Sequence, residues 1–154
     1  MSIQWFPGHM HKASNEMIEV LPLVNVIIEV LDARIPFSSS NPFIQSIGAE
    51  KPQIKVLNKT DLGDSKITKL WQKYFEQKAN TKTLALDLKN HNPSNQIIDL
   101  INKISPQKEG RSTLVMVTGI PNVGKSSLIN CLAGKHITKT GDEPAITKGQ
   151  QKIN

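Results

Sequence analysis

One segment, Gly119–Ser126, constrains the fold of this chain more than any other, because it matches GxxxxGK[ST] at every fixed position. An apolar run, Thr113–Thr118, directly precedes it, as a strand should. Its two glycines allow a turn in which successive backbone N–H groups point at phosphate oxygens in front of a helix. We therefore predict a phosphate-binding loop in which Lys125 reaches the β- and γ-phosphates and the Ser126 hydroxyl holds Mg²⁺.

A second polar segment, Asn58–Asp61, follows the apolar run Gln53–Leu57, at the carboxyl end of a strand, where open α/β sheets bind ligands. Its sequence resembles the NKxD motif of GTPases. An ionised Asp61 accepts both the N1–H and the 2-amino group of guanine, two donors that adenine lacks. Asn58 is expected to bond the base and tie this segment to the phosphate-binding loop, with the Lys59 stem along the ring. Alone, such a polar turn after a strand is common; beside a phosphate-binding loop it predicts recognition of guanine.

The remaining apolar pattern predicts an α/β fold with a mostly parallel sheet covered on both sides, a three-layer sandwich. Four short apolar or β-branched runs are typical of buried strands: Val24–Leu31, Gln53–Leu57, Thr83–Leu86 and Thr113–Thr118. Amphipathic helical stripes are formed by Ile67, Leu70, Trp71 and Tyr74, by Ile97, Ile98, Ile101 and Ile104, and by Leu128, Cys131 and Leu132.

Composition limits the classes of protein to which the chain can belong. Its 154 residues with 38% apolar content suffice for one core and one domain. The longest apolar stretch, Val24–Leu31, is too short to cross a bilayer and no signal region follows Met1, so we expect a cytoplasmic protein. The net charge of +6 indicates either a polyanionic partner such as RNA or merely a solvated basic face.

The order of the two nucleotide motifs is reversed relative to ordinary GTPases, in which the phosphate-binding loop comes first. A circular permutation explains this order, because joining the natural termini and opening another loop leaves the sheet and its site intact. With Gln4–Met10, Leu31–Pro36 and Gly149–Gln151 added, the chain resembles the ribosome biogenesis GTPase A family over essentially its whole length. The resemblance implies a P-loop NTPase fold with a circularly permuted GTPase domain.

The resemblance also implies an activity and partners. They are those of a cytoplasmic, monomeric GTPase that hydrolyses GTP to GDP and phosphate while the bacterial large (50S) ribosomal subunit assembles on its rRNA and proteins, away from any membrane. Mg²⁺ would be held by Ser126 and Thr147, and K⁺ by Asn122. His9 matches the histidine that the family is thought to use in orienting water toward the γ-phosphate. From the residues alone, a lone His after Pro-Gly such as His9 is more typical of a surface turn, and Asn122 is equally consistent with an exposed loop residue.

The expected nucleotide-binding residues combine both motifs with the resemblance. They are Asn58, Lys59, Asp61, Asp87, Leu88, Asn122, Val123, Gly124, Lys125, Ser126, Ser127 and Thr147. Asp87 and Leu88 stand where the family contacts guanine O6, and because their side chains depart from the family pattern, only a backbone role carries over to them.

The domain, residues 1–154, is expected to be incomplete. A GTPase needs a DxxG motif, whose Asp holds Mg²⁺ through water and whose Gly senses the γ-phosphate, and none follows Thr147. This predicts a chain truncated before the DxxG strand, with very low hydrolysis. The expected parts are an N-terminal helix at about 9–21, the guanine-recognition motif at 58–61, the P-loop at 119–126 and the switch I region at about 135–148.

Two functions from different classes therefore stay open. One is the GTPase of ribosome assembly. The other is a nucleotide-binding or RNA-binding module without turnover, which the absence of DxxG favours. An ATP-dependent kinase or ATPase is disfavoured, because adenine would leave the Asp61 carboxylate unpaired, at a cost of about 1–3 kcal/mol or more.

Overall fold

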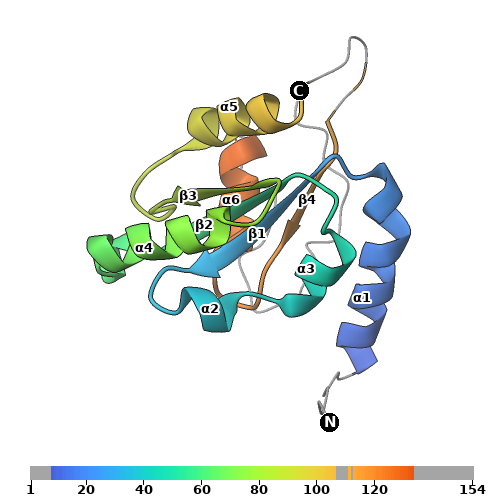
Figure 1. Ribbon diagram of the computed structural model, residues 1–154, viewed down its shortest axis with the longest axis horizontal. Helices are drawn as coiled ribbons and strands as arrows, with labels where there is room; N and C mark the ends of the chain where they lie inside the picture. The colour runs from blue at the N-terminus through green and yellow to red at the C-terminus, as the bar shows by residue number, and fades with distance from the viewer. Residues whose placement is uncertain (1–7, 107–110, 112, 134–154) are drawn as a thin grey trace.

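A computed structural model of the chain describes residues 8–106, 111 and 113–133. Within this part, four strands form one sheet in which every neighbouring pair runs parallel. They are β1 (Val26–Asp32), β2 (Gln53–Asn58), β3 (Thr81–Ala85) and β4 (Val115–Thr118), in the spatial order β3-β2-β1-β4. The predicted α/β class with a parallel sheet is confirmed (Figure 1).

Helices cover both faces of this sheet. They are α1 (Gly8–Val20), α2 (Pro36–Ser39), α3 (Pro42–Ile47), α4 (Ser65–Glu76), α5 (Ser94–Ile104) and α6 (Lys125–Ala133), with 3-10 turns η1 (Leu21–Leu23) and η2 (Thr60–Leu62). Buried side chains of α5 and α6 belong to the apolar cluster on one face, and those of α1, α3 and α4 belong to two clusters on the other. The result is the three-layer arrangement that alternating strands and helices predict.

The chain connections place the loops that matter for a ligand at one edge of the sheet. The chain passes from β1 to β2 to β3, crosses the other face through α5, and returns to β4 beside β1. All four strands are parallel, so their carboxyl ends share one edge, and the strand order reverses between β1 and β4. Such a reversal is where α/β sheets form a ligand crevice.

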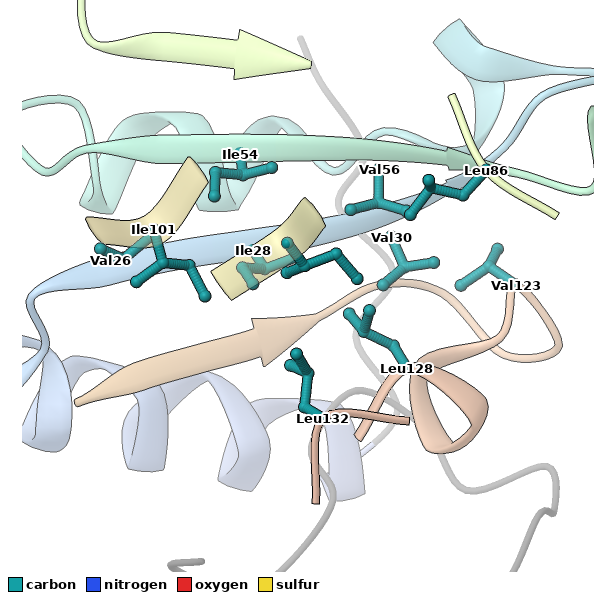
Figure 2. Packing of buried hydrophobic residues seen from close by; sticks show 11 residues of the cluster. Val26, Ile28, Val30, Ile54, Val56, Leu86, Ile101, Val123, Leu128 and Leu132 are labelled. Atoms are coloured by element: carbon teal, nitrogen blue, oxygen red, sulfur yellow. The ribbon is translucent and has the colours of Figure 1, made fainter. Parts of the chain in front are cut away.

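The larger core lies under α5 and α6. Val26, Ile28 and Val30 of β1 meet the β2 residues Ile54 and Val56 (Figure 2). The helices complete the same cluster with Ile97, Ile101, Leu128 and Leu132, all buried. Of the predicted helical stripes, those of α5 and α6 therefore face the sheet, with Ile98, Ile104 and Cys131 partly buried at their margins.

Of the predicted stripe of α4, only Trp71 packs against the sheet-side cluster, where it is partly buried. Ile67, Leu70 and Tyr74 are 50%, 60% and 46% exposed, whereas Thr68 and Phe75 of the same helix are buried. The spacing of apolar residues identified the helix correctly, but the buried side is displaced from the predicted stripe and shares only Trp71 with it.

The reason is the strand on which α4 packs. β3 is the edge strand next to β2, and Thr83 faces α4 from it. The Glu76 carboxylate accepts hydrogen bonds from the Thr83 backbone N–H at 3.0 Å and its hydroxyl at 2.9 Å, and Gln72 donates to the same hydroxyl. These polar contacts turn Gln72 and Glu76 toward the sheet, and the apolar stripe turns outward.

Candidate functional site

The loop between β4 and α6 has the backbone shape of a phosphate cradle. Gly119, Asn122 and Gly124 have positive φ angles of 156°, 64° and 110°. A side chain at Gly119 would place its Cβ 2.6 Å from the Val30 carbonyl oxygen, and one at Gly124 would lie 2.4 Å from Asn58 Nδ2. Both glycines of the motif are thus required by close backbone packing as well as by conformation.

Lys125 begins α6 and turns back into this loop. Its side chain is buried, and Nζ donates to the carbonyl oxygens of Gly119 at 2.8 Å and Ile120 at 2.9 Å. Burial lowers the pKa of this ammonium group below its ordinary value. No carboxylate in the described part of the chain forms an ion pair with it. A buried cation held only by carbonyl groups at a helix N-terminus suits an anionic ligand.

Asn58 joins three loops at the ligand edge of the sheet. At the end of β2, its Nδ2 donates to the Val123 carbonyl oxygen at 2.8 Å, and its Oδ1 accepts from the Leu88 backbone N–H at 3.0 Å. The side chain is buried and uses both ends of its amide. One residue of the second motif therefore fixes the phosphate-binding loop and the loop after β3 at once.

The rest of the second motif forms a tight turn with its carboxylate outside. Lys59 has a left-handed backbone with φ 65°, and both the N–H and the hydroxyl of Thr60 donate to the Leu86 carbonyl oxygen, at 3.2 and 3.0 Å. Asp61 is exposed at the start of η2. An exposed carboxylate in this turn can accept donors from a ligand.

Asp87 and Leu88 lie in the loop after β3. The Asp87 carboxylate accepts from Asn90 Nδ2 at 2.7 Å, and this bond lowers the pKa of Asp87. The side chain is thus engaged within its own loop, while Leu88 contributes its backbone N–H to Asn58. The backbone role toward guanine that the resemblance implies for this loop stays a prediction, since the Leu88 N–H is already donated to Asn58.

Other expected site residues are placed only in part. Ser126 and Ser127 occupy the first turn of α6, and Asn122 is exposed within the loop. The backbone of His9 lies in α1, but its side chain is outside the described part of the chain. Thr147 lies entirely outside it. Among described residues, no three His, Cys, Asp or Glu side chains gather as metal ligands, and no helix has the length and apolarity to cross a membrane.

Sequence reasoning missed the role of Asp32 and Arg34, at the end of β1. Arg34 binds Asp32 bidentately, with Nε at 3.0 Å from Oδ1 and the second guanidinium nitrogen at 2.7 Å from Oδ2, and Lys59 Nζ lies 3.4 Å from that same Oδ2. The signal was present in the sequence: an Asp-x-Arg pair directly after an apolar strand, in the segment Leu31–Pro36 that marks the resemblance.

Arg34 also determines the charge state of Asp32. Its guanidinium is the main cause that lowers the pKa of Asp32 to about 2; the Arg34 backbone N–H and Lys59 act in the same direction, and burial opposes them. Asp32 is 5% exposed and remains ionised at neutral pH. The site edge thus carries a buried carboxylate shared by two cations.

Known proteins resemble this chain over most of its length. Residues 114–154 match the family described as 50S ribosome-binding GTPase. The chain is 47% identical to ribosome biogenesis GTPase A of Bacillus pumilus and 46% identical to that of Bacillus licheniformis, each over 99% of this chain and 57% of the relative. It is 37% identical to mitochondrial ribosome-associated GTPase 1 of Mus musculus, over 94% of this chain and 48% of that protein.

The chain spans about half the length of the curated relatives it matches. The matched span includes both motifs, the Asp-x-Arg segment and the strands that carry them. The chain is therefore a homologue of ribosome biogenesis GTPase A over nearly its whole length.

Proposed function

We propose that this chain binds guanine nucleotides and hydrolyses GTP as part of ribosome assembly. The observation that carries the proposal is the pair of hydrogen bonds made by the Asn58 side chain, which join the phosphate-binding loop at Val123 to the loop at Leu88. A ligand that fills the cradle therefore has its other end beside Asp61 and the 87–88 backbone. Residues 1–154 then act as one GTP-binding domain.

The phosphate end of the nucleotide is assigned to the loop 119–126. Buried Lys125 leaves its carbonyl partners for the β- and γ-phosphates, and backbone N–H groups from Val123 onward complete the cradle. Among the described residues, Ser126 would hold Mg²⁺ through its hydroxyl. We propose Thr147 as the second protein ligand of the ion. The ion fits this donor set, since hydroxyl and phosphate oxygens are ligands that Mg²⁺ prefers; when bound it neutralises charge that develops on the phosphates.

The base end is assigned to Asp61. Its exposed carboxylate accepts the two donors of guanine in a fork, and Lys59 lies along the ring. An adenine nucleotide would leave this charge unsatisfied, which costs about 1–3 kcal/mol or more, at least roughly a tenfold loss of affinity.

Turnover and the ribosomal role are the further steps of the proposal. His9 would orient the attacking water and Asn122 would hold K⁺; both assignments rest on family resemblance. The names of the relatives, ribosome biogenesis GTPase A and mitochondrial ribosome-associated GTPase 1, support a ribosomal partner. The net charge of +6 supports one rich in RNA, and we propose the large subunit, in the cytoplasm.

Calorimetric titration with GDP and ADP tests nucleotide choice. We expect tighter binding of GDP, and in Asp61→Asn a shift of preference toward XDP, because xanthine carries an oxygen to which the Asn amide donates. Asp99→Asn, at an exposed position of α5, is the matched control and should keep the wild-type preference. Equal affinity of the wild-type chain for GDP and ADP would refute the assignment of Asp61.

A salt series tests the ribosomal partner. Binding to purified large-subunit particles should weaken steeply as salt rises, because contacts to phosphates release counterions. A flat response between low and physiological salt would assign the lysines to a solvated face instead.

A further inference from the structure

The Asp32 carboxylate at the end of β1 is a junction between two loops. It accepts hydrogen bonds from the Arg34 backbone N–H at 3.0 Å and from two guanidinium nitrogens, while Lys59 Nζ approaches it from the loop after β2. The Asp32 backbone N–H is itself held by Ser39 Oγ at 3.0 Å. The Asp32 carboxylate and the strand end are therefore held by Arg34 and Ser39 independently of Lys59.

Lys59 is the member of this junction that needs support. Its backbone has φ 65°, in the left-handed region that costs a non-glycine residue conformational energy. The residues on either side are anchored elsewhere, Asn58 to Val123 and Leu88, and Thr60 to Leu86. The Lys59 side chain itself is tied only to Asp32 among the described residues.

Lys59 shares the Asp32 carboxylate with Arg34. Asp32 faces two cations, Arg34 and Lys59, so it cannot fully balance both. Asp32 and, to a smaller extent, Asp61 raise the pKa of Arg34. Arg34 is half exposed at this edge.

We propose that Asp32 is a positioning residue for guanine recognition: fixed by Arg34, it holds the Lys59 side chain in place along the base, so that the turn 58–61 presents Asp61 to the ligand. The inference rests on the proposed binding of guanine nucleotides and adds to it a residue outside both nucleotide motifs. It predicts that Asp32 influences the base end of the ligand through Lys59 and leaves the phosphate end untouched.

A double-mutant cycle on the full chain tests this coupling. We expect Asp32→Asn and Lys59→Met each to weaken GDP binding by about fivefold to tenfold, the effect of losing one charge-assisted contact of about 1 kcal/mol. The double variant should bind GDP no more weakly than the weaker single variant, since residues that act through one contact are not additive. Losses that multiply in the double variant would overturn the inference.

A second readout separates positioning from a general structural effect. Inorganic tripolyphosphate probes the loop 119–126 alone, and its affinity should be the same in wild type, Asp32→Asn and Lys59→Met. An equal loss of tripolyphosphate and GDP affinity would overturn the inference, because Asp32 would then merely support the fold. Asp99→Asn and Lys69→Met, at exposed positions of α5 and α4, are the matched controls and should behave as wild type.

Arg34→Gln covers the case in which Asp32→Asn does not fold. This variant keeps the contact between Asp32 and Lys59 but removes the guanidinium that orients the Asp32 carboxylate. GDP affinity should therefore fall by about twofold to fourfold, less than in Lys59→Met. Unchanged GDP affinity in both Arg34→Gln and Lys59→Met would overturn the inference while the wild-type preference for GDP over ADP leaves the proposed function standing. A wild-type chain without that preference would overturn both.

Discussion

The two faces of the sheet are built from alternate residues of the same strands, yet they differ in what holds them together. On one face, Val26, Ile28 and Val30 of β1 and Ile54 and Val56 of β2 pack under α5 and α6 in a continuous apolar cluster (Figure 2). That cluster includes Val123 of the phosphate-binding loop. Non-directional hydrophobic burial fixes α6 and the loop that precedes it.

On the other face, a row of polar side chains crosses the sheet. Glu29 pairs in register with Lys55 on one side and Thr118 on the other, and Lys55 pairs with Thr83. All four are buried. Lys55 donates to Glu29, which also accepts from the Asn41 backbone N–H at 2.7 Å.

This polar row divides the apolar residues of its face into two clusters. Met17, Ile27 and Ile44 belong to one, and Leu31 and Phe75 to the other. One face is therefore stabilised by buried apolar area, whereas the other uses directional hydrogen bonds and an ion pair to hold the loops after β1. Such bonds tolerate the loss of one partner poorly, because a buried charge is then left alone.

The largest expected effect comes from breaking that pair. Glu29→Leu should lower the free energy of unfolding by about 3–5 kcal/mol, because it leaves the Lys55 ammonium buried without its counter-charge. Adding Lys55→Met should restore more than half of the loss, although the Asn41 N–H stays unpaired. Urea unfolding of both variants measures this.

Glu50→Leu, at an exposed position, is the matched control and should change stability by less than about 0.5 kcal/mol. A double variant less stable than Glu29→Leu would mean that the row stabilises by bonds other than the ion pair.

The apolar face is tested by Leu128→Ala in α6. Leu128 is fully buried, so the cavity should cost about 3 kcal/mol in urea unfolding, within the usual range for such a change. Leu23→Ala is the matched control, because Leu23 is 66% exposed in η1. A fall of less than about 1 kcal/mol in the free energy of unfolding would show that the neighbouring residues move in to fill the cavity, which a close-packed core does not do.

Acid titration sharpens the contrast at the ligand edge. The folded-state pKa of Asp32 is about 2, below its ordinary value of 3.8, so its contribution of about 2 kcal/mol is present above pH 3.8 and lost as the pH falls through 2. Asp32→Asn should therefore be less stable than wild type at pH 5 to 7, with the difference shrinking toward pH 2. Asp99→Asn should show no such pH-dependent gap.

Much of the fold and site was predictable because its signals are local. The runs at 53–57 and 113–118 contain β2 and β4 to within two residues at each end, and the two glycine positions of the loop need the freedom that the motif implies. Asn58 was expected to tie the two motifs together, and its contact with Val123 has that geometry.

The rest depends on register and partners that the sequence does not display. Burial of Glu29 against Lys55 follows only once β1 and β2 align, 26 positions apart in the chain. The outward turn of the α4 stripe likewise follows from Thr83 on an edge strand that the helix meets later. Asp32 and Arg34 stood in a segment that carried a resemblance but no chemical role until Lys59 was placed beside them.

Helix starts offer a smaller test, because α4 on the polar face is capped by its own N-cap residue, whereas at α5 on the apolar face the Ser94 N–H donates to Asn92, one residue before the N-cap. Asp64 accepts from the backbone N–H groups of Lys66 at 2.8 Å and Ile67 at 3.1 Å, whereas Pro93 makes no such bond. Asp64→Ala should cost about 1 kcal/mol in thermal or urea unfolding. Asp64→Ser should keep most of this stabilisation, because the Ser hydroxyl can also accept from the first backbone N–H groups. Equal losses of stability in both variants would refute the cap.

The smallest expected effect is that of Leu70→Gln on the apolar stripe of α4, and its comparison with Phe75→Ala tests which side of that helix is inside. Leu70 is 60% exposed, so Leu70→Gln removes little buried area and should change the free energy of unfolding by less than about 0.5 kcal/mol. Phe75, five positions along the same helix, is 2% exposed between Leu31 and Leu57, so Phe75→Ala should cost about 3–5 kcal/mol. If α4 instead packed on the side that its apolar spacing alone favours, Leu70→Gln would become the costly change and Phe75→Ala the mild one. Urea unfolding of the two variants therefore distinguishes a helix oriented by its apolar stripe from one oriented by the bonds of Gln72 and Glu76 to the edge strand.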